Sequence, residues 1–172
     1  ALTDFIFMVE NTSYMFVTGP NVVKTVTNEE VTAEELGGAE THSSKSGVTH
    51  FSCQNELHAI NSIKKLLSYI PQNCEETAKH NQYAIENEVR ESLSEIIPEN
   101  PNQPYDIRKV INEIVDKDSF FEVHEAYAQN IVVGFGRIGG EPVGIVGNQP
   151  LVLAGCLDID SSVKAARFVR FC

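Results

Sequence analysis

The feature that constrains the fold most is a pair of apolar runs separated by glycines in the last third of the chain. Residues 131–133 are Ile-Val-Val, residues 143–147 are Val-Gly-Ile-Val-Gly, and Gly-Gly-Glu-Pro occupies 139–142 between them. Runs of β-branched residues bounded by glycine and proline are typical of strands joined by a turn. We therefore predict a glycine-rich hairpin with strands over residues 129–137 and 142–147.

The same glycines carry a competing pattern. Gly134, Gly136 and Gly139 match the GxGxxG fingerprint of dinucleotide-binding domains. That fingerprint needs a helix after its last glycine, because the helix N-terminus faces the pyrophosphate. Since a turn and a second apolar run follow Gly139, we favour the hairpin. An NAD-dependent enzyme built on residues 134–139 is the weaker alternative.

The N-terminal part of the chain shows short elements of both kinds. Apolar runs predict strands at residues 3–9, 14–17 and 48–52. Helical signals predict a short helix at 21–26, one capped turn at 32–35 that ends at Gly37-Gly38, and an amphipathic helix at 55–69. A polar loop is expected at residues 39–47.

A compositional shift divides the chain. Residues 71–104 are rich in Asn, Gln, Glu and Pro, which indicates a linker, with one amphipathic segment expected on Ile85, Val89, Leu93 and Ile97. Beyond it, Asp106 is expected to cap a helix whose apolar face comprises Ile107, Val110, Ile111, Ile114 and Val115.

The rest of the second half is predicted to hold one more strand and a final helix. The strand is expected at residues 119–124, before the hairpin. We expect Ser161-Ser162 to cap the final helix, with Lys164, Arg167 and Arg170 as a basic stripe on its surface.

Composition excludes some partners. The 172 residues carry a net charge of −11, which argues against nucleic acid and against an anionic membrane surface. No apolar run approaches the roughly 18 residues of a membrane span. The four cysteines have no CxxC spacing and the five histidines are scattered, so we expect no metal site and a reduced intracellular protein.

Four segments in sequence order carry a family resemblance. Residues 16–51, 66–73, 98–111 and 143–172 resemble biotin-dependent acyl-CoA carboxyltransferases, which include propionyl-CoA and acetyl-CoA carboxylase β subunits and methylmalonyl-CoA decarboxylase α subunits. The resemblance implies an α/β, crotonase-like fold of stacked β-β-α turns. It also implies that 1–70 end an N-terminal half, 71–104 link the halves, and 105–172 begin a C-terminal half.

The same resemblance implies an activity. Such proteins move a carboxyl group between biotin and the α-carbon of a short acyl-CoA, and backbone N–H groups in glycine-rich turns stabilise the oxyanion. In the family these turns lie outside the matched stretch, so no catalytic residue is named. Both ends look cut, and we expect an inactive fragment of a longer enzyme. The alternatives are a decarboxylase subunit and an interaction module that binds subunits but no substrate.

Two loops are the candidate sites on this resemblance. The substrate-side candidates match an LGGA-x-x-H-x-x-x-SG segment and are Gly37, Gly38, Ala39, His42, Ser46 and Gly47. The alternative is a helix C-cap followed by an ordinary loop, and His42 is disfavoured as a general base. The biotin-side candidates are Gly147, Asn148, Gln149 and Pro150. Their alternative is a turn whose amides satisfy buried backbone.

The implied partners follow from the chemistry of the family. Biotin would be carried by a partner protein or domain and not bound covalently by this chain. The expected partners are an acyl-CoA, a biotin carboxyl carrier, biotin carboxylase or decarboxylase subunits, and further copies of this chain. The expected compartment is the cytoplasm of a bacterium or the mitochondrial matrix of a eukaryote.

Overall fold

The chain divides into two compact units. The computed structural model describes residues 3–81, 92–100 and 102–172. The first unit comprises Ala1–Lys64 with His124–Tyr127, and the second comprises Lys65–Val123 with Ala128–Cys172. The assignment of residues 1–70, 71–104 and 105–172 to two enzyme halves and a linker stays a prediction.

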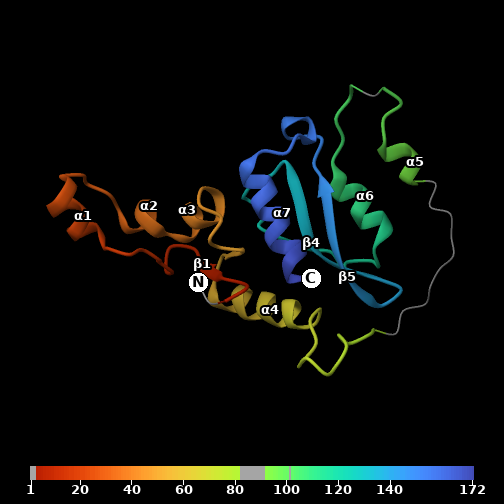
Figure 1. Ribbon diagram of the computed structural model, residues 1–172, viewed down its shortest axis with the longest axis horizontal. Helices are drawn as coiled ribbons and strands as arrows, with labels where there is room; N and C mark the ends of the chain where they lie inside the picture. Colours follow the sequence, from red (N-terminus) through yellow and green to blue (C-terminus); the bar gives the residue numbers. More distant parts are fainter. Residues whose placement is uncertain (1–2, 82–91, 101) are drawn as a thin grey trace. The chain divides into compact units, whose positions relative to one another are not determined.

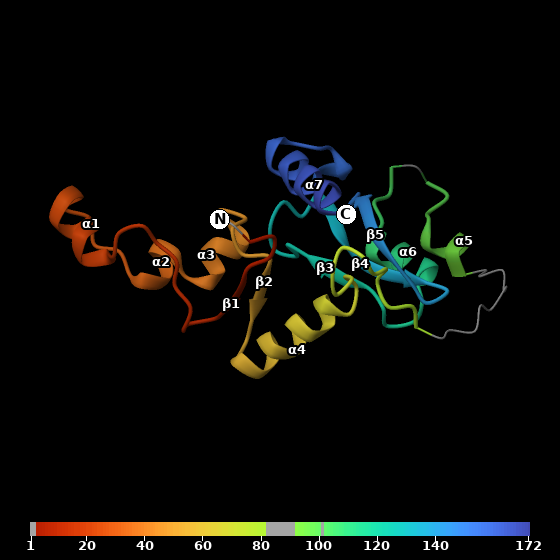
Figure 2. The same ribbon diagram turned by 60° about the horizontal axis from the view of Figure 1, so that its bottom comes forward.

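The first unit is built on a short parallel strand pair. Strand β1 (Phe7–Val9) pairs with β2 (Phe51–Cys53), with Phe7 opposite Phe51. Their rings stack at 4.5 Å between centroids. Figure 2 shows the two strands side by side. The predicted strands at 3–9 and 48–52 are therefore present but shorter.

Three helices connect these strands, and each begins at a recognisable signal. They are α1 (Pro20–Thr27), α2 (Ala33–Gly37) and α3 (Ala39–Ser44). Pro20 begins α1, where its missing N–H costs nothing. The predicted capping box of α2 is confirmed, because the Thr32 hydroxyl accepts from the Glu35 N–H and the Glu35 carboxylate accepts from the Thr32 N–H.

Two predictions for the first unit are wrong. Helix α3 occupies much of the predicted polar loop at 39–47, because Gly38 is extended and so ends α2 and begins α3. Residues 14–17 form no strand, since only Tyr14 makes an isolated bridge, to Gly38. Their apolar side chains are exposed rather than buried. A run of four apolar residues fits an exposed wall as well as a buried strand.

Helix α4 (Glu56–Leu67) confirms the predicted amphipathic helix, but its burial differs from the pattern. Leu57, Ile60 and Leu67 are exposed, whereas Ala59 and Leu66 are buried. The apolar repeat thus predicted the helix correctly without indicating which face would be covered.

The second unit is an antiparallel sheet in the order β3-β4-β5. Its strands are β3 (Phe121–Val123), β4 (Ile131–Ile138) and β5 (Glu141–Asn148). Ile138 pairs with Glu141, so Gly139 and Gly140 form a two-residue turn, with φ of 60° and 86°. Positive φ at both turn positions suits a hairpin. The predicted hairpin is confirmed. The alternative interpretation of residues 134–139 as a dinucleotide-binding turn is wrong, because a strand and not a helix follows the glycines.

Two helices cover opposite faces of this hairpin (Figure 1). These are α6 (Ile107–Ile114) and α7 (Ile159–Phe171). Val132 packs against Ile111 and Val115 on the α6 side. Phe135 contacts Phe168 of α7 with ring centroids 5.1 Å apart. Side chains alternate between the two faces of a strand, and Val132 and Phe135 are an odd number of positions apart. They therefore lie on opposite faces and pack against different helices.

The start of α7 corrects two predictions. Its N-cap is Asp158, which forms a capping box with Ser161, so the serines lie inside the helix. Lys164 is not on a basic surface stripe but 2% exposed, and its ammonium donates to the carbonyls of Ala128 and Ile131 at 3.3 and 2.8 Å. Its long apolar stem lets the residue occupy an interior position.

The remaining elements are short. Helix α5 (Ser92–Ile96) lies in the predicted linker, and the 3-10 turn η1 (Leu153–Gly155) precedes α7. Ile85 and Val89, two positions of the predicted amphipathic segment, fall outside the described residues. Among the helices that the structure describes, none has the length and apolar character needed to cross a membrane.

Candidate functional site

The turn at Gly37-Gly38 is held against the segment that contains Met15. The Met15 N–H donates to the Gly37 carbonyl at 2.8 Å. A Cβ at Gly37 would overlap the Met15 carbonyl oxygen, and one at Gly38 would overlap the Glu34 carboxylate. At residue 37, only glycine therefore permits this approach of the two backbones.

His42 joins the same two segments through its side chain. Its Nε2 lies 2.5 Å from the Met15 carbonyl oxygen and its Nδ1 lies 2.8 Å from the Ser46 hydroxyl. A carbonyl oxygen only accepts, so Nε2 carries the proton, and in the neutral ring Nδ1 accepts from Ser46. Both nitrogens are thus engaged in hydrogen bonds within the protein.

Gly47 lies at the end of this loop and is held from another direction. Its φ is +61°, and a Cβ there would overlap the Tyr127 ring. His124 Nε2 lies 3.0 Å from the Gly47 carbonyl, and the His124 ring contacts the buried His50 at 4.1 Å between centroids. The loop is therefore fixed by packing as well as by glycine conformation.

Met15 and His42 border a hollow of about 690 Å³ in the first unit. It is mainly apolar, and its lining residues are Tyr14, Met15, Phe16, Val17, Thr18, Leu36, His42 and Val48. A largely apolar concavity with a few polar groups suits a small organic ligand. Ala39 is fully buried, so it supports the loop and presents no surface to a ligand.

Of the substrate-side candidates, His42 lines this hollow, whereas Gly37, Gly38, Ala39, Ser46 and Gly47 are not among its lining residues. Sequence reasoning missed Met15 and Phe16, which form its wall, because their apolar run was interpreted as a buried strand. A usable signal was present: a polar turn at residues 10–13 and Gly19-Pro20 confine the run to a few residues.

The biotin-side candidates lie in the second unit, where their amides contact backbone and a cap. Gln149 is 1% exposed, and its Nε2 donates to the Asp106 carboxylate at 2.6 Å. Its Oε1 accepts from the Ile107 N–H at 3.2 Å. The Asn148 amide donates to the Gly155 carbonyl at 2.8 Å. The Gln149 contacts join the segment after β5 to the start of α6, and the Asn148 contact joins β5 to η1, as the alternative for this loop predicted.

The electrostatics of this junction favour a charged Asp106. Burial acts to raise the pKa of its carboxyl, but hydrogen bonds from the Gln149 amide and the Arg108 N–H outweigh burial and hold the pKa below its usual value. Arg108 itself forms two hydrogen bonds with Glu122, at 2.6 and 2.7 Å. The junction is an internally satisfied support, and contact of this loop with biotin stays a prediction.

The turn of the glycine hairpin is occupied by a carboxylate. Asp116 accepts from the N–H groups of Gly139 and Gly140 at 2.8 and 2.7 Å. Arg137 is also buried, and its guanidinium donates to the carbonyls of Ser68, Lys79 and Gly140. The N–H groups that a phosphate would need are therefore used within the protein, which fits the hairpin and not a nucleotide site.

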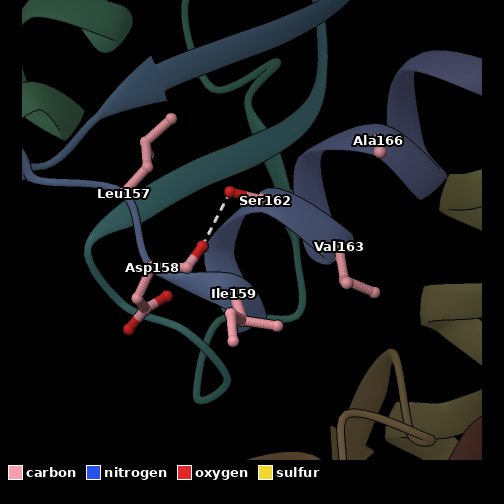
Figure 3. Close-up of a pocket in the computed structure, with 6 residues that line it drawn as sticks. All are labelled: Leu157, Asp158, Ile159, Ser162, Val163 and Ala166. Atoms are coloured by element: carbon pink, nitrogen blue, oxygen red, sulfur yellow. Dashed lines mark hydrogen bonds between the residues drawn. The ribbon is translucent and has the colours of Figure 1, made fainter.

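A second hollow, of about 590 Å³, lies at the start of α7 (Figure 3). Leu157, Ile159 and Val163 line it, and the Ser162 hydroxyl donates back to the Asp158 carbonyl at 2.7 Å. Its polar groups serve the helix cap, so the hollow offers an apolar surface without a convergent polar site.

Metal binding by a cluster of side chains and a reactive thiolate at Cys53 find no support in the part of the chain that the structure describes. Within those residues, no group of three or more His, Cys, Asp or Glu side chains could hold a metal ion. The four cysteines are free, and burial raises the pKa of the Cys53 thiol. A raised pKa disfavours the reactive thiolate.

Comparisons with known proteins define the family. The chain belongs to the carboxyl transferase domain family, which matches residues 1–172. It is 56% identical, over its whole length, to a propionyl-CoA carboxylase carboxyltransferase subunit of Haloferax mediterranei. It is 51% identical to the methylmalonyl-CoA decarboxylase α subunit of Veillonella parvula. In both cases it covers 34% of the relative, so the chain spans about a third of these proteins.

Solved structures agree on the fold. The transcarboxylase 12S hexamer, crystallised with hydrolysed methylmalonyl-CoA, superimposes with a TM-score of 0.95 at 48% identity. The match covers 99% of this chain and 34% of that one. The predicted α/β, crotonase-like carboxyltransferase fold and the family resemblance are therefore confirmed.

Proposed function

We propose that the complete protein containing these residues is a carboxyltransferase that moves a carboxyl group between biotin and the α-carbon of a short acyl-CoA. The observation that carries this proposal is the family match across all 172 residues, together with relatives named for propionyl-CoA carboxylation. The apolar hollow that His42 lines supports it.

The hollow of the first unit suits the acyl side of such a substrate. Met15, Phe16 and Leu36 offer apolar surface, and the Thr18 hydroxyl and His42 ring are the polar groups near it. Removal of a short alkyl group from water stabilises a complex by about 0.8 kcal/mol for each buried CH₂. We assign the acyl group to this hollow and leave the transferred carboxyl to catalytic turns elsewhere in the protein.

Biotin, its carrier and the oligomer belong to the same proposal. A relative in Mycobacterium tuberculosis is named as biotin-dependent, and the transcarboxylase structure is titled as a hexamer. We propose that a partner protein or domain carries the biotin. We also propose that biotin carboxylase or decarboxylase subunits assemble with this protein, and that the chain self-associates. The free cysteines are consistent with a reducing compartment, either the bacterial cytoplasm or the mitochondrial matrix.

The second candidate is the same half-reaction in the decarboxylating direction. The methylmalonyl-CoA decarboxylase relative at 51% identity favours it specifically. A non-catalytic interaction module is the remaining alternative. The inactivity expected of residues 1–172 alone stays a prediction.

The test is a transfer assay with the complete subunit and a carboxylated biotin carrier. We expect ¹⁴C from the carrier to appear in acid-stable acyl product with propionyl-CoA, and none to appear without acyl-CoA. Methylmalonyl-CoA supplied with uncarboxylated carrier measures the reverse direction. Absence of transfer in both directions, with carrier binding retained in a pull-down, would replace the proposal with the interaction module.

A further inference from the structure

One peptide segment at the hollow is held at both ends of a single residue. The N–H of Met15 donates to the Gly37 carbonyl at 2.8 Å, and its carbonyl oxygen accepts from His42 Nε2 at 2.5 Å. Because N–H and C=O of one residue flank its side chain, these two bonds fix the direction in which Met15 projects. The next residue, Phe16, starts from the same fixed peptide.

Two further hydrogen bonds within the protein orient His42. Its Nδ1 lies 2.8 Å from the Ser46 hydroxyl, and its backbone carbonyl accepts from the Thr49 N–H at 3.1 Å. The ring is half-buried and lines the hollow. A ring with both nitrogens bonded within the protein is suited to hold a neighbour and poorly suited to remove a proton from a substrate.

Among the described residues, few other contacts fix the held segment. Tyr14 makes an isolated bridge to Gly38 and its hydroxyl donates to the Asn11 carbonyl at 2.8 Å, and Met15 and Phe16 are 42% and 41% exposed. Exposed residues outside a sheet rely on few contacts, so each of these hydrogen bonds matters to the shape of the wall.

We propose that His42 is a positioning residue of the acyl site. With a proton on Nε2 it holds the Met15 carbonyl, and so sets the wall that Met15 and Phe16 present to the acyl group of a short acyl thioester. This inference rests on the proposed function, since it names a residue that shapes the same site. It assigns His42 no proton transfer.

The experiment compares four variants of the complete subunit. His42→Gln keeps an N–H donor near the Nε2 position but cannot titrate, whereas His42→Phe keeps a ring without a donor. Ser46→Ala removes the orienting hydroxyl only. His58→Leu, on the exposed surface of α4, is the matched control, because among the described residues its ring accepts a hydrogen bond from the Gln54 N–H, at 3.3 Å, and lies away from the hollow lining.

Kinetics give the first readout, with acetyl-, propionyl- and butyryl-CoA as substrates. For His42→Phe we expect KM for acyl-CoA to rise about tenfold, as for one lost hydrogen bond, with a smaller fall in kcat and an altered order among the three substrates. His42→Gln should recover most of this loss with an unchanged pH profile. Ser46→Ala should lie between, and His58→Leu should match the wild type.

Hydrogen–deuterium exchange gives a second readout that does not depend on activity. The Met15 amide should exchange faster in His42→Phe and at the wild-type rate in His42→Gln and His58→Leu. Unchanged exchange at Met15 in His42→Phe overturns the proposal. Loss of transfer in His42→Gln as deep as in His42→Phe, with one limb of the pH profile gone, also overturns it and makes His42 a general base. An inactive wild type with the expected exchange pattern would refute the carboxyltransferase function and leave the positioning of Met15 intact.

Discussion

Two glycine pairs, one in each unit, lie next to a carboxylate but need glycine for different reasons. At Gly37-Gly38, φ of Gly38 is −78°; Gly37 needs to be glycine because the Met15 carbonyl approaches too closely for a Cβ, whereas the neighbour of Gly38 is the flexible Glu34 side chain. At Gly139-Gly140, φ is positive at both residues, so the conformation itself favours glycine, and at Gly140 a Cβ would also overlap the Asn81 carbonyl oxygen.

The two carboxylates differ as well. Asp116 accepts one N–H with each oxygen, at 2.8 and 2.7 Å. Glu34 accepts a single, longer bond from the Glu40 N–H at 3.3 Å, and its buried Oε2 has no hydrogen-bond partner among the described residues. The hairpin turn is a satisfied structural unit, whereas the turn beside the hollow is tightly packed but less completely bonded.

Gly37→Ala should have the largest effect. The added Cβ meets backbone, the Met15 carbonyl, which cannot move without displacing the wall of the hollow. We expect about 3 kcal/mol of lost local stability. Exchange protection of α2 and α3 in the complete subunit measures it. Gly19→Ala is the control, since a Cβ there meets only the Phe16 ring at 3.6 Å. Equal effects of the two variants would mean that close approach is not the reason for Gly37.

Asp116→Ala should come next. It leaves two N–H groups of the hairpin turn without their charged acceptor, and hydrogen bonds to charged groups contribute about 1.5–3 kcal/mol each. Because water can reach part of the turn, we expect a total loss of about 2 kcal/mol, measured by exchange of β4 and β5 amides. Glu34→Ala is the comparison and should cost less. A larger loss for Glu34→Ala would reverse the contrast between the two turns.

A pH titration should separate the capping box of α2 from these carboxylates. The Thr32 N–H and hydroxyl hold the pKa of Glu35 below its ordinary value. Its stabilising contribution is therefore complete above the unfolded pKa of about 4.3 and is lost as pH falls through the folded pKa. Exchange of α2 amides, corrected for intrinsic rates, should rise in that acid range, and Glu35→Gln should remove most of the dependence. Persistence of the dependence in that variant would exclude Glu35 as its source.

Gly139→Asn should have the smallest effect. Its φ of 60° lies in the left-handed region that asparagine adopts more readily than other side chains, so we expect a change within about 0.5 kcal/mol. Gly139→Val should cost more, because β-branched residues strongly disfavour this region. The same exchange measurement on β4 and β5 compares them. Equal effects would argue that conformation is not what selects glycine there.

Local chemistry made much of the fold predictable. The capping box at Thr32, the helix that begins at Asp106 and the two-residue hairpin turn depend on residues a few positions apart, so their signals are contained in short segments. The family resemblance came from longer segments in sequence order, and the comparisons confirmed it.

The candidate site was only partly predictable, because its geometry depends on contacts between distant residues. The glycines of residues 37–47, the cap signals and the family resemblance are recognisable from the order of residues alone. Packing in three dimensions is what places residues 14–17 in an exposed wall, buries Lys164, and brings His42 to a carbonyl 27 positions away. Side-chain type limits what a residue can bond, but which donor meets which acceptor is decided when the chain packs and every buried polar group requires a partner.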